Sequence, residues 1–179
     1  MLTQEELIQG AYVQYVRFQG IDETSSFNFE KRFEGDLATQ FGVLNDFIKS
    51  QIVRRVQREL GAPYESNYPL QAIQELLFNA VIHRDYQSNA PIRFYEFEDR
   101  IEIINPGGLF GDARPENFPH TNDYRNPALA EAAKVLGWVN KFNVGVKRAM
   151  KALEDNGNPP AEFIKDQLTT FGVKIFKRP

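Results

Sequence analysis

The chain of 179 residues contains no cysteine, which excludes disulfides, thiol chemistry and zinc–thiolate sites. It has two histidines, His83 and His120, and these leave little scope for a histidine-rich metal site. No apolar run reaches the roughly 18 residues that a membrane-spanning helix needs. The first residues also lack the basic and apolar segments of a signal peptide. Together these absences predict a cytoplasmic protein without membrane contact.

An excess of charge of one sign is also missing. The chain has 21 Lys and Arg against 24 Asp and Glu, a net charge of −3, so the chain as a whole lacks the electrostatic footprint of a DNA-binding protein. A local basic cluster of Lys49, Arg54, Arg55 and Arg58 requires no explanation beyond a solvated face. Hydrophobic residues make up 42% of the chain, which is enough for the core of one domain, or of one domain with an appendage.

A polar stripe runs along one predicted helix, in the segment from Tyr68 to Tyr86. Pro69 fits the first helical turn, where its missing N–H has no partner to lose. At about 100° per residue, Glu75, Asn79 and His83 follow one another on one side. The opposite side is apolar and consists of Ile73, Leu76, Leu77, Ala80 and Val81. A carboxylate and a carboxamide one turn apart can reach the same ligand or a hard cation such as Mg²⁺. The plainer alternative is a surface helix with a polar outer face.

A predicted hairpin and a glycine-rich loop follow this helix. Ile92–Phe97 and Arg100–Ile104 have the composition of two strands around a short turn. They lead into Asn105-Pro106-Gly107-Gly108-Leu109, where the glycines permit positive φ and close approach of the backbone. A plain tight turn would also explain a Gly-Gly pair, so the pair alone does not indicate a ligand site. The order of helix, hairpin and glycine-rich loop is the stronger evidence.

This order resembles the GHKL (Bergerat-fold) ATP-binding domains. It resembles more closely one branch of them, the helicase-like C-terminal ATP-binding domain of bacterial and archaeal transcriptional regulators, which usually follows a Schlafen-type AlbA_2 domain. The resemblance covers about Pro69 to Phe176. The motifs that carry it are Asn79-Ala80-Val81-Ile82-His83-Arg84-Asp85-Tyr86, Asp99-Arg100-Ile101-Glu102-Ile103-Ile104-Asn105-Pro106-Gly107-Gly108-Leu109 and Arg125-Asn126-Pro127. The P-loop motif is absent, which argues against helicase action despite the name of the branch.

The resemblance implies a site for ATP or ADP with Mg²⁺. A Glu at the position of Glu75 lies beside the γ-phosphate in these proteins and can activate water, and an Asn at the position of Asn79 holds the Mg²⁺ ion. Asn105 stands where the fold usually has an Asp that accepts a hydrogen bond from the adenine amino group, and an amide oxygen can accept the same bond. His83 could face the nucleotide pocket, but packing or capping at the helix end, where a cation is favourable, is the preferred interpretation.

Two glycine motifs complete the implied site. Gly107 and Gly108 form the first, and Asn143 and Gly145 stand in the second. Between them, the irregular segment 110–124 occupies the position of the ATP lid. The second motif departs from the family because Asn143 and Val144 replace a glycine and its neighbour. We therefore expect a binding or regulatory domain, with at most weak ATPase activity. The alternative is a degenerate GHKL-like module that acts in protein interaction or dimerisation.

The predicted fold is an α/β two-layer sandwich, a mixed sheet covered by helices on one face, with a small N-terminal appendage. Other expected elements are a short opening helix capped by Thr3, strands 11–18, 27–33 and 170–176, and helices 36–50, 126–136 and 144–156. Residues 52–60 are assigned to a strand, and Asn126 to the N-cap of its helix.

Residues 1–60 are interpreted as the end of an AlbA_2-like domain plus a linker helix, and residues 61–179 as the GHKL-like domain. Tyr15-Val16-Arg17-Phe18-Gln19-Gly20 and Phe33-Glu34-Gly35 resemble that ending. This resemblance predicts that the chain is a fragment of a longer transcriptional regulator, with a naturally short protein as the alternative. DNA would then be contacted through regions outside the fragment. Homodimerisation is left open.

Overall fold

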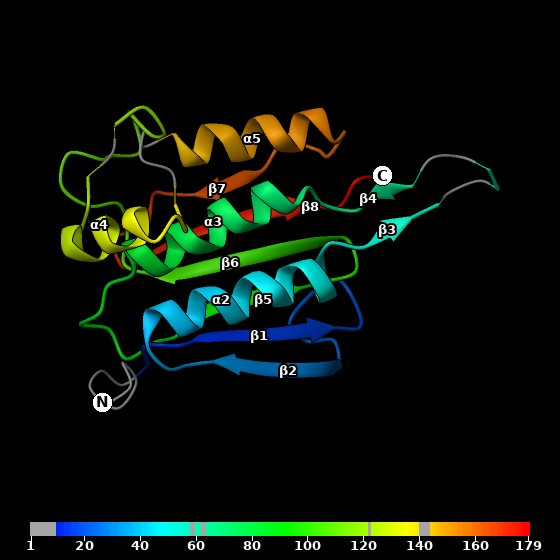
Figure 1. The fold of residues 1–179 in the computed structure, drawn as a ribbon, viewed down its shortest axis with the longest axis horizontal. Coiled ribbons are helices and arrows are strands. Elements are labelled where there is room, and N and C mark those ends of the chain that lie inside the picture. Colours follow the sequence, from blue (N-terminus) through cyan, green and yellow to red (C-terminus); the bar gives the residue numbers. More distant parts are fainter. Residues whose placement is uncertain (1–9, 58–59, 62–63, 122, 140–143) are drawn as a thin grey trace.

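A computed structural model describes residues 10–57, 60–61, 64–121, 123–139 and 144–179. A six-stranded mixed sheet has the order β2-β1-β5-β6-β8-β7, and helices cover one face of it (Figure 1). This arrangement confirms the predicted two-layer α/β class. The strands are β1 (Val13–Phe18), β2 (Phe27–Phe33), β5 (Ile92–Glu96), β6 (Arg100–Pro106), β7 (Glu162–Ile164) and β8 (Thr170–Phe176). The helices are α2 (Leu37–Phe47), α3 (Leu70–His83), α4 (Pro127–Val135) and α5 (Gly145–Asp155).

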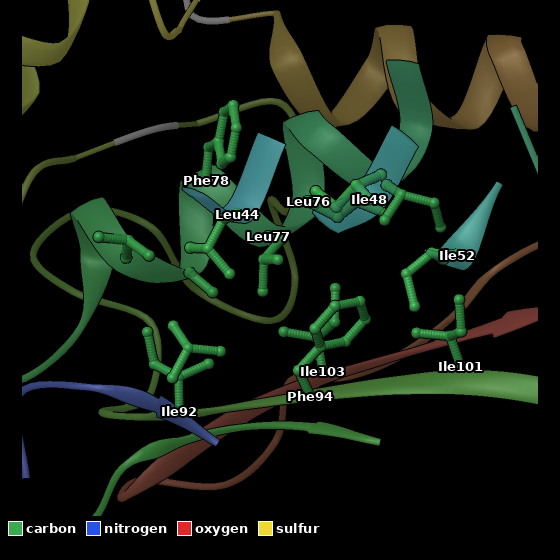
Figure 2. Packing of buried hydrophobic residues seen from close by; sticks show 14 of the residues in the cluster. Leu44, Ile48, Ile52, Leu76, Leu77, Phe78, Ile92, Phe94, Ile101 and Ile103 are labelled. Atoms are coloured by element: carbon green, nitrogen blue, oxygen red, sulfur yellow. The ribbon is translucent and has the colours of Figure 1, made fainter. Parts of the chain in front are cut away.

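The core lies between the sheet and α3, the helix that carries the polar stripe. Side chains alternate along a strand, so Phe94 on β5 and Ile101 and Ile103 on β6 share the face that the helices cover. Figure 2 shows these side chains facing Leu76 and Leu77 of α3. Because the same alternation continues, Asn105 at the end of β6 lies on this covered face too.

Helix α3 runs between α2 and α5 (Figure 1). Asp36 caps α2, since its Oδ1 accepts a hydrogen bond from the backbone N–H of Thr39 at 3.0 Å. After Phe47 the chain continues as a π-helical turn, Ile48–Ile52. A pair of two-residue strands, β3 (Arg55–Val56) and β4 (Glu65–Ser66), then forms a separate small sheet.

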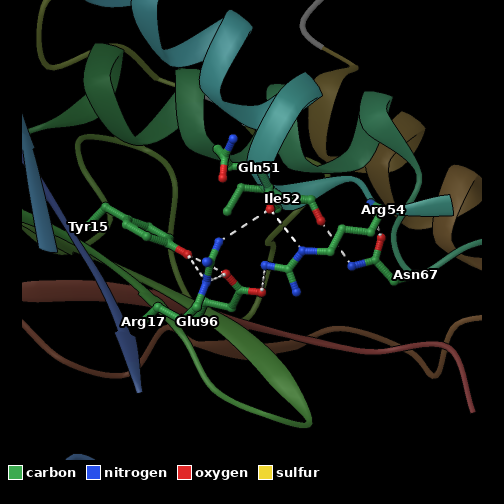
Figure 3. Close-up of polar contacts among 7 residues, drawn as sticks. All are labelled: Tyr15, Arg17, Gln51, Ile52, Arg54, Asn67 and Glu96. Atoms are coloured by element: carbon green, nitrogen blue, oxygen red, sulfur yellow. Dashed lines mark hydrogen bonds and ion pairs between the residues drawn. The ribbon is translucent and has the colours of Figure 1, made fainter. Parts of the chain in front are cut away.

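A buried cluster of charged groups joins β1 and β5 to the segment that follows the π-helical turn (Figure 3). The carboxylate of Glu96, with a side chain only 7% exposed, accepts hydrogen bonds from Arg17 Nε at 2.8 Å and from the Tyr15 hydroxyl. Arg54 Nη2 pairs with its other oxygen at 2.8 Å. Burial, and then the nearby Glu96 carboxylate, raises the pKa of Tyr15 well above its usual range, so its hydroxyl remains a donor. The cluster therefore links Arg54, after the π-helical turn, to strands β1 and β5 of the sheet.

Several boundaries differ from the sequence predictions. Helix α3 ends at His83 instead of reaching Tyr86, because the Arg84 backbone turns to ψ 141°. Pro69 is the N-cap of that helix and not a residue of its first turn. The strand predicted over residues 52–60 shrinks to Arg55–Val56, and the chain before it is π-helical. The predicted opening helix lies outside the described residues.

Arg84 explains why α3 stops where it does. The whole residue is only 1% exposed. Its guanidinium donates hydrogen bonds to the backbone carbonyls of Gly10, Ser88 and Ala90 at 2.8–2.9 Å. These bonds fold residues 84–90 back beneath the helix end. These long-range contacts accompany the end of α3, and helical periodicity does not indicate them.

Asn126 is the N-cap residue of α4, as predicted, but its side chain is used elsewhere. It precedes α4 as expected, but its side chain makes no capping hydrogen bond there. Instead Nδ2 donates to the carbonyls of Ile82 and Arg84, both at 2.8 Å, and so satisfies the last turn of α3. Among the described residues, no helix is long and apolar enough to cross a membrane.

Candidate functional site

A cavity of about 120 Å³ opens beside the polar stripe of α3. Glu75, Asn79 and His83 all line it, as their helical spacing predicts. The apolar residues named for the opposite side of the helix are all buried in the core. The polar stripe is therefore the wall of a cavity and not a solvent-facing surface.

The end of β6 and its glycine loop form a second wall. Asn105, Gly107 and Gly108 line the cavity with the α3 residues. Gly107 has φ of 100°, and a Cβ there would lie 2.9 Å from Asp85 Cβ. A Cβ on Gly108 would lie 2.5 Å from the Gln167 carbonyl oxygen. Their N–H groups donate to the carbonyls of Thr169 and Leu168. Close packing against Asp85 and the segment before β8 therefore already requires glycine at these two positions.

The N-terminus of α5 forms the third wall. Gly145, its first residue, packs so closely on α3 that a Cβ would lie 2.6 Å from Glu75 Oε2 and 3.1 Å from Asn79 Nδ2. No side chain caps this end of α5. The surviving glycine of the second motif thus lets a helix N-terminus, with its free N–H groups, approach the stripe. Asn143, the other predicted residue of this motif, lies outside the described residues.

Two opposing effects act on the pKa of Glu75. Its side chain is 11% exposed, and burial raises its pKa, while Arg148 acts in the opposite direction. Arg148 Nη1 lies 3.4 Å from Glu75 Oε1. With the Gln71 amide oxygen turned toward the guanidinium, that oxygen accepts from Arg148 Nε and Nη2 at 2.9 and 2.7 Å. Arg148 is therefore fixed between two residues of α3.

His83 is uncharged at neutral pH. Burial, and then repulsion from Arg125, lowers its pKa to about 4, although Asp123 acts in the opposite direction. Its ring stacks on Tyr124, with centroids 5.1 Å apart and planes 16° apart. The ring lines the cavity and also packs against Tyr124. Its position is therefore compatible with both predictions, a residue that faces the pocket and a residue that packs at the helix end. A cationic role at the helix end does not fit, because the imidazole is neutral.

Asn105 presents the cavity with an unsatisfied acceptor. The residue is 3% exposed, and its Oδ1 has no hydrogen-bond partner among the described residues. Leaving such a buried oxygen unpaired costs about 1–3 kcal/mol. A ligand with an N–H donor would satisfy it.

Aromatic side chains form the remaining part of the cavity wall, and the sequence prediction missed them. Phe118 packs on Phe163 and Phe171, with ring centroids 5.0 and 5.4 Å away. Phe110 and Tyr124 line the cavity as well. The predicted lid segment, 110–124, thus contributes to the wall in its described part. Phe163 and Phe171 come together through the β7–β8 pairing, which local patterns do not reveal.

Comparison with known proteins gives a partial match. Residues 89–175 match the family model described as "Putative ATP-dependent DNA helicase recG C-terminal". This stretch is similar to an ATPase-type, nucleotide-binding domain. It contains Asn105, Gly107, Gly108 and Gly145, but it begins after α3 and so does not include Glu75 and Asn79. No curated protein matches the chain.

Among solved structures, the DIP2311 protein from Corynebacterium diphtheriae has a similar fold. The TM-score is 0.80 at 23% sequence identity, and the match covers 93% of this chain and 35% of that one. At this identity the likeness concerns the fold alone. This chain spans about a third of the length of that protein.

A metal would have few protein ligands here. Among the described residues, no group of three or more His, Cys, Asp or Glu side chains could hold an ion. Mg²⁺ commonly keeps several waters and uses one or two protein oxygens plus substrate phosphates. The amide oxygen of Asn79 could make such a limited contribution, and its assignment as a metal ligand remains a prediction.

Proposed function

We propose that this domain binds an adenine nucleotide, ATP or ADP, together with Mg²⁺. The observation that carries the proposal is the buried, unpaired Oδ1 of Asn105. The 6-amino group of adenine is a donor that would satisfy this acceptor, and the neighbouring aromatic side chains suit a flat ring. The similarity of residues 89–175 to an ATPase-type domain supports the same ligand.

The phosphates would lie at the opposite end, between α3 and α5. Asn79 would hold Mg²⁺ there, and the uncapped N-terminus of α5 favours negative charge. A bound Mg²⁺ would supply charge neutralisation for the phosphates. Glu75 would act as the general base if the nucleotide is hydrolysed, and its raised pKa suits that role. Its pairing with Arg148 restrains it, so binding is the primary function that we propose.

The resemblance of the motifs to transcriptional regulators supports a wider role. We propose that nucleotide occupancy of this domain regulates a longer protein whose other regions contact DNA. A second candidate, a degenerate module for protein interaction or dimerisation, is favoured by one observation. The N–H groups of Gly107 and Gly108 already donate to carbonyls of the segment before β8, so the glycine loop offers few donors to a nucleotide.

Calorimetric titration with ATP and ADP, with and without Mg²⁺, tests the proposal. We expect saturable binding, strengthened by Mg²⁺, and loss of that strengthening in Asn79→Ala. Asn105→Asp keeps an acceptor and should bind adenine nucleotides, whereas Asn105→Leu should bind about tenfold or more weakly, as for loss of a hydrogen bond from a buried site. A folded wild-type protein that gives no heat at millimolar nucleotide would reject binding and favour the interaction module.

A further inference from the structure

We propose that Lys147, in the first turn of α5, makes this cavity select nucleoside di- and triphosphates over the unphosphorylated nucleoside. The inference rests on the proposed nucleotide function and adds a residue that determines which nucleotides bind. Lys147 lines the same cavity as Asn105 and Glu75. Lys147 is exposed and stands two residues after Gly145, which packs against Glu75 and Asn79 of α3.

The charge balance at this end supports the assignment. Glu75 is the acid of the α3 stripe, and alone it would repel a phosphate. Arg148 offsets that charge from behind, because it contacts Glu75 at 3.4 Å and does not line the cavity itself. The other acid in the wall, Asp123, belongs to the segment beside His83 and Tyr124. Lys147 forms no ion pair with any described residue, so its charge remains available to a ligand.

The backbone adds to this positive end. Helix α5 has 11 residues, and neither a capping side chain nor an acidic residue stands at its beginning. The first N–H groups of a helix have no partner within it, and its dipole favours an anion. Gly145 keeps this end free of a side chain beside Glu75. A phosphate at this end would therefore meet N–H donors and the Lys147 ammonium together.

The other end of the cavity supplies an independent indication of a ligand. Asn105 Oδ1 is buried, unpaired among the described residues and part of the same wall. A molecule that satisfies both ends carries an N–H donor at one end and negative charge at the other. A nucleoside diphosphate meets both requirements, whereas a nucleoside meets the first requirement alone.

The test compares the binding of adenosine, AMP and ADP by calorimetry in the wild type, Lys147→Gln and Lys147→Arg. We expect Lys147→Gln to weaken ADP binding about tenfold and to leave adenosine within about twofold, because the lost contact is with phosphate. The dependence of ADP affinity on salt should also decrease. Lys147→Arg keeps the charge and should restore most of the affinity.

Lys151→Gln is the matched control, one turn further along α5. Lys151 pairs with Asp155 Oδ1 at 2.6 Å and does not line the cavity, so its loss should leave all three affinities unchanged. If the wild type binds ADP but Lys147→Gln weakens adenosine and ADP equally, or neither, the role of Lys147 is refuted while nucleotide binding stands. If the folded wild type binds none of the three ligands, the proposed function fails and this inference fails with it.

Discussion

The pH dependence of stability should reveal the neutral His83. The pKa of this imidazole lies at about 4 in the folded protein, against 6.5 for an ordinary histidine, because it is buried and faces Arg125. Above pH 6.5 the ring is neutral in both the folded and the unfolded chain, so its protonation does not reduce the free energy of unfolding there. Below that pH the unfolded chain takes up a proton that the folded chain does not. Stability is therefore lost as the pH falls from 6.5 towards 4.

The size of this loss follows from the shift. A difference of one pKa unit corresponds to about 1.4 kcal/mol, so lowering the pKa from 6.5 to about 4 amounts to roughly 3 kcal/mol by pH 4. Carboxylates titrate over the same range and add their own pH dependence. A comparison with a variant that lacks the imidazole isolates the part due to His83.

Urea denaturation from pH 4 to pH 7.5, in the wild type and in His83→Phe, measures this part. The phenyl ring keeps a flat partner for Tyr124 and cannot take up a proton. Between pH 7 and pH 4, we expect the free energy of unfolding to fall by about 3 kcal/mol less in His83→Phe than in the wild type. His120→Gln removes an exposed histidine and should follow the wild type. Parallel curves for the wild type and His83→Phe would show that the imidazole is not held neutral by its surroundings.

Three further substitutions test other parts of the structure by the same denaturation assay. Glu96→Gln leaves two arginines facing a neutral amide and should destabilise the protein by about 3 kcal/mol. This is near the low end for a broken buried ion pair, because the Arg54 side chain is 43% exposed. A loss below about 1 kcal/mol would contradict a stabilising role of the Glu96 ion pairs. Asn126→Ala should lose about 1–3 kcal/mol of stability, and Asn126→Asp should lose more, since a carboxylate cannot donate to two carbonyls. Equal stability of the Asp variant and the wild type would contradict the role of these two hydrogen bonds. Gly145→Ala should change stability by less than about 1 kcal/mol but displace the Glu75 carboxylate, which a crystal structure of the variant would show.

The layers of the fold could be predicted because local patterns specify them. The β8 strand was expected over residues 170–176 and occupies Thr170–Phe176, and the hairpin strands end within two residues of their expected limits. In each strand apolar residues recur at every second position, as at Ile101 and Ile103 of β6. The short β7 strand has three residues, too few to show a period, and it was missed.

The candidate site could be predicted where it follows one periodic element or a quoted motif. Glu75, Asn79 and His83 reach one cavity through helical spacing, and Asn105 reaches it through strand alternation. The roles of these residues remain predictions. Nothing local shows that Arg148 reaches back to Glu75, because that contact depends on how α5 docks against α3. The division at residue 60 also remains a prediction, although β1 and β5 pair in one sheet.

The contacts around the cavity suggest how a ligand would be admitted. At about 120 Å³ the cavity is smaller than the roughly 300–1,000 Å³ of typical ligand sites. Two contacts narrow it: α5 touches Glu75 through Gly145, and Tyr124 stacks on His83. The proposed nucleotide needs more room than this, so we expect α5 or the described residues of the 110–124 segment to move outward on binding, and the free energy of that opening to reduce its affinity. Variants that loosen either contact without touching Asn105 or Lys147 should therefore bind nucleotide more tightly, which separates the opening step from recognition.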